Sequence, residues 1–110
     1  KGGTAATSAE NTTLAVVVTD ALLTKSQAKR LAMIAQTGFA RAIYPVHAPL
    51  DGDVVFAVAT GANPVDPLFG LTELGMVAAN VTARAIARAI HAATALPFAN
   101  ALPAWRDRFG

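Results

Sequence analysis

The chain has 110 residues, of which 54% are hydrophobic and only 15% are charged, with a net charge of +2 and no cysteine. Because an average globular domain has about 25% charged residues, we expect part of this apolar surface to face another polypeptide. The lysines and arginines are spread along the chain, which argues against nucleic-acid binding. The lack of cysteine excludes disulfides, thiolate metal sites and a cysteine nucleophile.

Neither a membrane span nor a signal peptide is indicated. The apolar runs are short, such as Leu14–Val18, whereas a spanning helix needs about 18 apolar residues or more. Residues 1–3, Lys-Gly-Gly, contain no initiator methionine, and no apolar signal core follows them. We therefore expect the sequence to begin inside a longer protein, and we expect that protein to be cytoplasmic.

The first half of the chain predicts a strand and then a helix. Residues 1–11 are small and polar and are expected to be flexible. Residues 12–19 are rich in β-branched residues without polar alternation, which is typical of a strand covered on both faces. After a short connection, Thr24 and Gln27 have capping-box spacing, so an amphipathic helix should begin there. Pro45 should end this helix or follow its end.

The second half predicts another strand and helix. Residues 53–60 form a second apolar strand, and residues 61–70 read as a surface loop. Thr72 can cap a long helix running to about residue 94, mostly buried except for one polar stripe. That stripe consists of Asn80, Arg84, Arg88 and His91. The order strand, helix, strand, helix predicts an α/β fold, but two strands make only a thin layer rather than a finished sheet.

Two short polar motifs stand at the entrances of the two predicted strands. They are Asn11-Thr12-Thr13 and Asp51-Gly52-Asp53. Residues two apart in a strand point to the same face, so Asp51 and Asp53 could present both carboxylates to one site. Thr12, at the head of the neighbouring strand, would then lie within reach.

A threonine hydroxyl becomes a useful nucleophile when a base takes its proton, and the α-amine of the same residue can be that base once it is a chain terminus. Thr12 could create this arrangement by attacking the Asn11 carbonyl and cutting the chain between them. Ordinary roles are also open for both motifs. Asn-Thr-Thr occurs as a strand-entry turn and matches the N-glycosylation pattern, and Asp-Gly-Asp is a common tight turn.

Residues 11 to about 97 resemble the small subunit of the family of L-aminopeptidase/D-esterases, β-aminopeptidases and nylon-oligomer hydrolases. The resemblance covers most of the chain. It is carried by four segments: Asn11-Thr-Thr-Leu-Ala-Val-Val-Val-Thr-Asp20, Leu23-Thr-Lys-Ser-Gln-Ala-Lys-Arg-Leu-Ala32, Gly38-Phe-Ala-Arg-Ala-Ile-Tyr-Pro-Val-His47 and Asp51-Gly-Asp-Val-Val-Phe-Ala-Val-Ala-Thr-Gly61.

The resemblance implies a self-cleaving precursor whose large and small subunits remain together in a four-layer αββα sandwich and assemble into oligomers. Residues 12–95 would form the nucleophile-bearing α/β subunit and residues 96–110 a packing arm. Thr12 would be the nucleophile, supported from Asp51 and Asp53. The aminopeptidase branch typically has Ser and Glu at these two supporting positions and a Ser nucleophile, so this chain is more similar to the nylon-oligomer hydrolases. The oxyanion-stabilising residues would lie in the large subunit.

Two other functions stay open at this point. One is acyl transfer to an amine, because ornithine acetyltransferases share the self-cleaving threonine architecture, and the other is a scaffold subunit without catalysis. His47 could be a base, but a surface or structural role is the simpler expectation, as it is for His91. We expect no metal and no cofactor. Trp105 and Phe109 are expected to anchor an interface.

Overall fold

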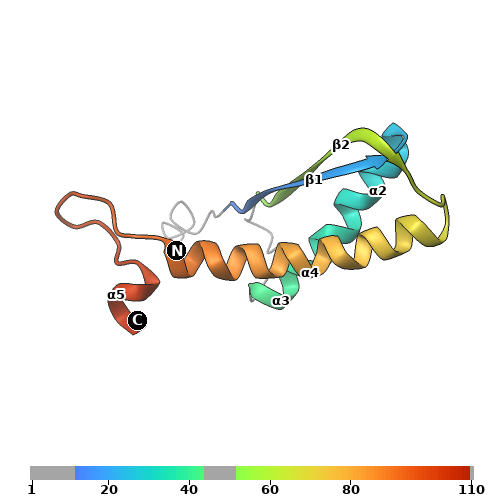
Figure 1. Ribbon diagram of the computed structural model, residues 1–110. Helices are drawn as coiled ribbons and strands as arrows, with labels where there is room; N and C mark the ends of the chain where they lie inside the picture. The colour runs from blue at the N-terminus through green and yellow to red at the C-terminus, as the bar shows by residue number, and fades with distance from the viewer. Residues whose placement is uncertain (1–11, 44–51, 110) are drawn as a thin grey trace, which may run out of the picture.

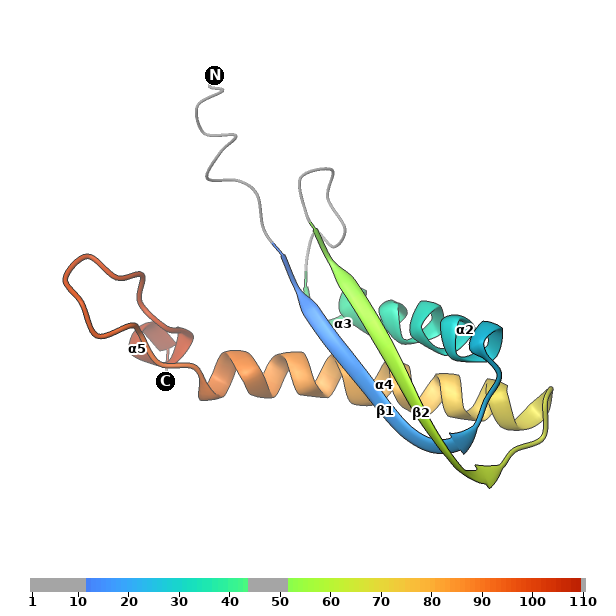
Figure 2. The same ribbon diagram turned by 90° about the horizontal axis from the view of Figure 1, so that it is seen from above.

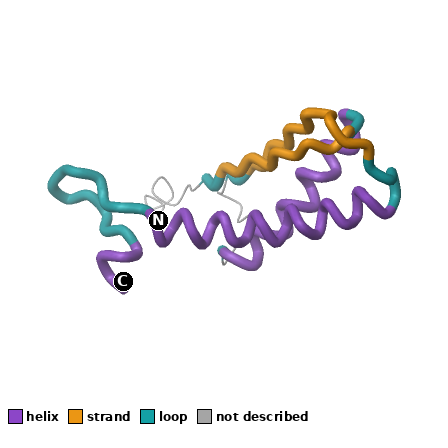
Figure 3. Tube along the Cα trace, viewed as in Figure 1, coloured by secondary structure: helices purple, strands orange, loops and turns teal. Residues whose placement is uncertain are grey.

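The computed structural model describes residues 12–43 and 52–109 (Figure 1). The described chain has the predicted order of strand, helix, strand and helix, so the α/β class is confirmed (Figure 3). In chain order the elements are strand β1 (Leu14–Leu22), helix α2 (Lys25–Ala35), 3₁₀ turn η1 (Gln36–Gly38), helix α3 (Phe39–Ala42), strand β2 (Val54–Pro64), helix α4 (Phe69–Ala92) and helix α5 (Trp105–Phe109).

The two strands form a parallel pair whose register runs from Leu14 opposite Val54 to Thr19 opposite Ala59. Both strands extend further than predicted, because they continue past an irregularity between Thr19 and Ala21. Helices α2 and α4 lie on the same side of this sheet, which we call its inner face (Figures 1 and 3). The opposite side is the outer face, and it exposes Leu14, Val16, Val18, Leu22, Phe56 and Val58.

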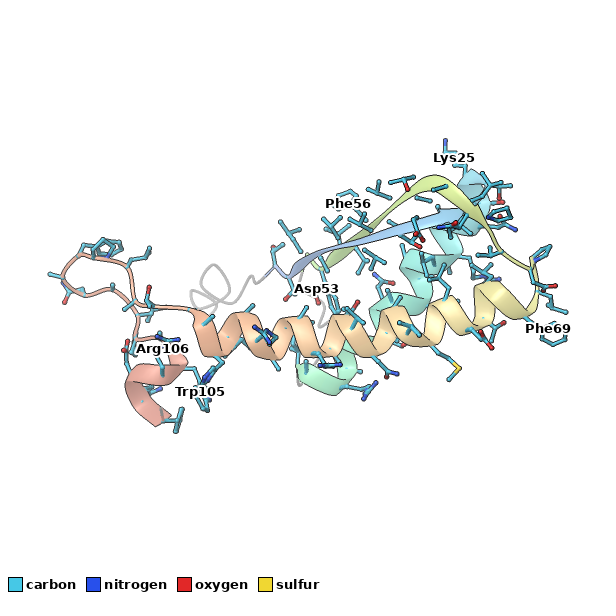
Figure 4. The ribbon with its side chains drawn as sticks, viewed as in Figure 1. Lys25, Asp53, Phe56, Phe69, Trp105 and Arg106 are labelled. Carbon is cyan, nitrogen blue, oxygen red and sulfur yellow. The ribbon has the colours of Figure 1, made fainter. Side chains whose placement is uncertain are left out.

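Within the described chain only one face of the strands is covered, so coverage of both faces stays a prediction. Helices cover the inner face alone, and Phe56 stands on the outer side of the sheet, away from α4 (Figure 4). The side chains of Leu14 and Val18 are both 67% exposed. A β-branched strand without polar alternation is typical of a sheet covered on both faces, and the described chain covers one of them.

Helix α2 begins where the capping box predicts. The Gln27 N–H donates to the Thr24 hydroxyl at 3.1 Å, and the Thr24 N–H donates to Gln27 Oε1 at 2.8 Å. The helix ends earlier than expected, at Ala35, and is followed by η1 and α3. In this break the Thr37 hydroxyl donates to the Ile34 carbonyl at 2.7 Å, a local bond that competes with regular helical geometry.

Helix α4 begins earlier than predicted, with Leu68 as its N-cap residue, and the carboxylate of Asp66 rather than the hydroxyl of Thr72 accepts from its first N–H groups. Asp66 Oδ1 accepts from the N–H groups of Leu68 and Phe69 at 2.9 and 2.7 Å. The Thr72 hydroxyl instead donates to the Leu68 carbonyl at 2.9 Å. An acidic residue just before a helix accepts otherwise unpaired amides and favours the positive end of the helix dipole. Asp66-Pro67 was therefore the sequence signal for this helix start.

The core is small and lies where α2 and α4 meet the inner face. Leu31 and Ala35 of α2 and Ala78 of α4 are buried together, and partly buried residues from both strands pack around them. Most of α4 was expected to be buried, which is wrong in this chain. A helix of 24 residues is about 36 Å long, and a two-stranded sheet is too narrow to cover it (Figure 2).

The segment after α4 folds back onto the end of that helix. It contains the short helix α5, an element that the sequence did not predict, and the Ala104 N–H donates to Asp107 Oδ2 at 2.9 Å at its start. Arg106 Nε and one terminal guanidinium nitrogen donate to the His91 carbonyl at 3.1 and 3.0 Å. The rings of Trp105 and His91 are 5.5 Å apart. This arm is therefore bonded to the His91 carbonyl in the last turn of α4.

The described chain is extended rather than spherical. Its radius of gyration is 16.9 Å, whereas a compact domain of this length has about 13 Å. The C-terminal half of α4 and the α5 arm project beyond the sheet (Figure 2). Among the described residues, no helix is both long enough and apolar enough to cross a membrane.

Candidate active site

The two polar motifs meet at the edge of the sheet where β1 and β2 begin. The Thr13 N–H donates to Asp53 Oδ1 at 2.9 Å, and the Thr13 carbonyl accepts from the Val54 N–H at 3.0 Å. Parallel strands start at the same edge, so residues forty positions apart in sequence become neighbours. Asp53 stands at this end of the sheet in Figure 4.

Thr12 lies directly beside Gly52. A Cβ atom placed on Gly52 would be 3.1 Å from the Thr12 hydroxyl oxygen, which is tight for two atoms that do not form a hydrogen bond. Thr12 itself is exposed. The glycine therefore leaves room around this hydroxyl, and the hydroxyl can be reached from outside the described chain.

The Thr12 hydroxyl belongs to the residue directly before Thr13, whose N–H the Asp53 carboxylate binds. Continuing the register from Leu14 and Val54 places Thr12 opposite Gly52, toward the outer face. Asp53 Oδ1 accepts a hydrogen bond from the N–H of the next residue, Thr13. Asp53 is thus one peptide unit away from the predicted nucleophile and fixes the backbone that carries it.

The remaining predicted residues divide into two groups. Asn11, Asp51 and His47 lie outside the described residues. His91 is described, and it lies near the far end of α4 beside Trp105, which Figure 4 places well away from Asp53. In the part of the chain that the structure describes, no group of three or more His, Cys, Asp or Glu residues could hold a metal ion.

Sequence reasoning missed two features of this site. One is the Thr13 N–H as the partner of Asp53, and the other is the open space that Gly52 leaves for Thr12. Both features could have been predicted from the positions of the two motifs. Each motif directly precedes its strand, so the two motifs lie side by side once the strands pair in parallel. The prediction treated Gly52 only as a turn residue.

The family model described as Peptidase family S58 matches residues 2–102, which is nearly the whole chain. The chain belongs to peptidase family S58. An uncharacterized aminopeptidase of Mycobacterium tuberculosis is 41% identical to it, over 90% of this chain and 31% of the relative. An uncharacterized aminopeptidase of Mycobacterium leprae is 50% identical, over 78% of this chain and 27% of the relative.

These matches confirm the family resemblance drawn from the sequence. The chain also spans less than a third of the length of the curated relatives it matches. Family S58 membership therefore rests on almost all of this chain, while more than two thirds of each of these relatives lies outside the matched region.

Proposed function

We propose that this chain is the C-terminal, nucleophile-bearing part of a family S58 precursor that cuts itself between Asn11 and Thr12 and then hydrolyses amide bonds. The observation that carries the proposal is the bond from the Thr13 N–H to Asp53, 2.9 Å long, directly beside the exposed Thr12. A carboxylate that accepts from backbone N–H at this point holds the first peptide of β1 rigid. The names of the mycobacterial relatives point to aminopeptidase activity.

Self-cleavage needs one hydroxyl and one peptide bond. The Thr12 hydroxyl oxygen attacks the Asn11 carbonyl carbon, the bond from that carbon to the Thr12 nitrogen breaks, and the hydroxyl proton passes to the nitrogen. The result is an ester between Asn11 and the Thr12 side chain. Water hydrolyses the ester, which leaves a carboxyl group on Asn11 and both a free amine and a free hydroxyl on Thr12.

Turnover repeats the same attack on a substrate. The free Thr12 amine takes the hydroxyl proton, the oxygen attacks the substrate carbonyl, and the leaving amine departs with a proton. Water then releases the acyl group from Thr12. Asp53 supports this by fixing the Thr13 peptide, and Asp51 is proposed as the second supporting carboxylate.

The remainder of the precursor is the proposed large subunit. It would supply the oxyanion-stabilising groups and complete the αββα sandwich by packing a second sheet on the outer face. The exposed apolar side chains there favour this, since rows such as Leu14, Val16 and Val18 rarely face water in a finished protein. Oligomers of such heterodimers are the proposed assembly.

The test is intact-mass analysis of the full-length protein together with an assay on a panel of amide substrates. We expect a species that begins at Thr12. A Thr12→Ala variant should stay uncut and inactive, whereas Thr12→Ser, which keeps a hydroxyl, should retain both cleavage and turnover. A Thr12→Ala protein that is still cut would overturn the proposal.

The same assay separates hydrolysis from acyl transfer. Product analysis with an added amine acceptor should give free acid as the main product if water is the acceptor. If the acyl group appears mainly on the amine, the reaction is the transfer that ornithine acetyltransferases perform. An intact chain without turnover on any amide or ester would instead indicate a scaffold subunit.

A further inference from the structure

An apolar hollow of about 520 Å³ runs along one edge of β1. It is lined by six successive residues, Thr13 and the first five residues of β1, and by one face of α4 that includes Val81, Ala85 and Ala89. Among its described lining residues there are none from β2. We call this hollow the β1 groove. Successive strand residues point alternately up and down, so a wall made of all six means that the groove follows the strand edge rather than a face.

The edge that borders the groove carries backbone groups without a strand partner in the described sheet. That sheet contains only β1 and β2, in that order. Because the Thr13 carbonyl accepts from the Val54 N–H, parallel geometry directs the N–H and C=O groups of alternate residues from Thr13 onward to β2. The groups of Leu14, Val16 and Val18 therefore point the other way, into the groove.

This edge also lacks the usual protection against strand addition. Exposed edges are normally blunted by lysine, proline or a bulge, whereas residues 14–18 are Leu-Ala-Val-Val-Val. The irregularity in the pairing of β1 with β2 comes only after Thr19. Below the edge, α4 continues past the sheet on the side away from β2 (Figure 2). There its exposed residues Val81 and Ile90 offer an apolar floor.

We propose that a β-strand from the N-terminal part of the same precursor pairs with this edge of β1 and fills the β1 groove. The matched relatives are more than three times as long as their region of similarity, so most of such a precursor lies outside this chain. An added strand satisfies the outward backbone groups and covers α4 in one step. The proposal rests on this chain being part of a longer precursor, and it is independent of the chemistry of Thr12.

The consequence for the site is that the strand carrying Thr12 becomes an internal strand. It is held by β2 on one side and by the added strand on the other, and both begin or pass near the hydroxyl. Fixing the nucleophile on both sides reduces the motion that would misplace it.

The test is residue-resolved hydrogen exchange on the full-length protein carrying Thr12→Ala, so that both parts stay in one chain whatever Thr12 does. We expect the amides of Val16 and Val18 to exchange on the order of 100-fold or more slowly than in the unfolded chain, like the amide of Val17 that faces β2. An alternating pattern, with Val17 slow and both neighbours fast, would overturn the proposal.

Two variants on α4 provide a matched comparison. Ala85→Arg places a charge in the groove and should speed exchange at Val16 and Val18 by at least about tenfold. Ala87→Arg, two residues further on and so on the opposite side of the helix, should leave both amides unchanged. Equal effects of the two variants, or no effect of either, would contradict the groove as the docking site.

A photo-crosslinking residue at Val81 identifies the occupant even if Ala85→Arg fails to fold. We expect crosslinks to a peptide that precedes residue 1 in the same molecule. Crosslinks between two copies, with protection that falls on dilution, would show that a second copy fills the groove and would reject the proposal. Because activity is not measured, failure here is distinct from failure of the Thr12 mechanism.

Discussion

Asp53 is the described side chain that ties the two strands together at the candidate active site. Its bond to the Thr13 N–H is partly buried and links residues forty positions apart. Hydrogen bonds to a charged group are stronger than neutral ones, so this contact restrains the backbone beside Thr12 more than an amide side chain would.

Asp53→Asn should lower kcat for amide hydrolysis by about 10- to 100-fold, because a charge-assisted hydrogen bond contributes about 1.5–3 kcal/mol. KM should change little, since Asp53 holds the backbone rather than the substrate. Steady-state kinetics of the full-length protein measure both values.

Asp20→Asn is the matched control. Asp20 is also a strand carboxylate bonded across the sheet, to Asn63 Nδ2 at 2.7 Å, but it lies at the opposite end of β1 from Thr12. It should keep normal kcat. An equal loss in both variants would mean that general sheet stability, not the site, is responsible.

Asp66 gives the protein a pH-dependent helix cap. Hydrogen bonds from the Phe69 and Leu68 N–H groups hold the pKa of this carboxyl below its ordinary value of 3.8. A lowered pKa in the folded state means that the stabilisation is fully present above the ordinary value. It is lost as the pH falls through the lower folded value.

Thermal unfolding of wild type and Asp66→Ala at several pH values tests this cap. The difference in Tm should be largest near neutral pH and should shrink as the pH falls below about 3.8. A difference that stays constant down to strongly acidic pH would show that the charge of Asp66 has no part in the effect.

At the scale of elements, the contact between the α2–η1 segment and α4 depends on small residues. Gly38 is buried, and a Cβ there would collide with the Ala79 carbonyl oxygen of α4. Because that oxygen belongs to a helix backbone, it cannot turn aside as a flexible side chain could. The close approach of these two segments therefore requires glycine at position 38.

Gly38→Ala should destabilise the protein by about 1–3 kcal/mol, the usual cost of overpacking. Urea denaturation of the full-length protein measures this. Gly70→Ala is the comparison, because its nearest neighbour would be the Val65 Cβ at 3.2 Å and alanine favours the first turn of α4. It should be near neutral, and a larger loss there than at Gly38 would contradict the packing argument.

The elements show what local sequence can and cannot predict. Thr24 and Gln27 fixed a helix start because a capping box lies within four residues. The close approach of Gly38 to Ala79, by contrast, joins distant residues, and periodicity does not contain it. The same holds at the site: the motifs were visible in sequence, but the bond of Asp53 to Thr13 depends on strand register.

At the scale of the whole molecule, helices cover one face of the described sheet and leave the other face open. Helices pack on the inner face, while the outer face shows Phe56 at 55% and Val16 at 61% exposure. An apolar surface of this kind on an extended chain is expected where another layer packs. Part of the apolar surface expected from the composition is thus located on the outer face of the sheet.

The last prediction concerns this outer face in the full-length protein. Phe56→Lys should lower its free energy of unfolding by about 3–5 kcal/mol, the range found for removing a buried phenylalanine. Met33→Lys is the matched control, because Met33 is 49% exposed on α2 and lies on the helical side of the sheet. It should cost no more than about 0.5 kcal/mol, as surface substitutions usually do. Urea denaturation measures both variants. If Phe56→Lys were as mild as Met33→Lys, the outer face would be exposed to water in the complete protein, and no second sheet could pack there.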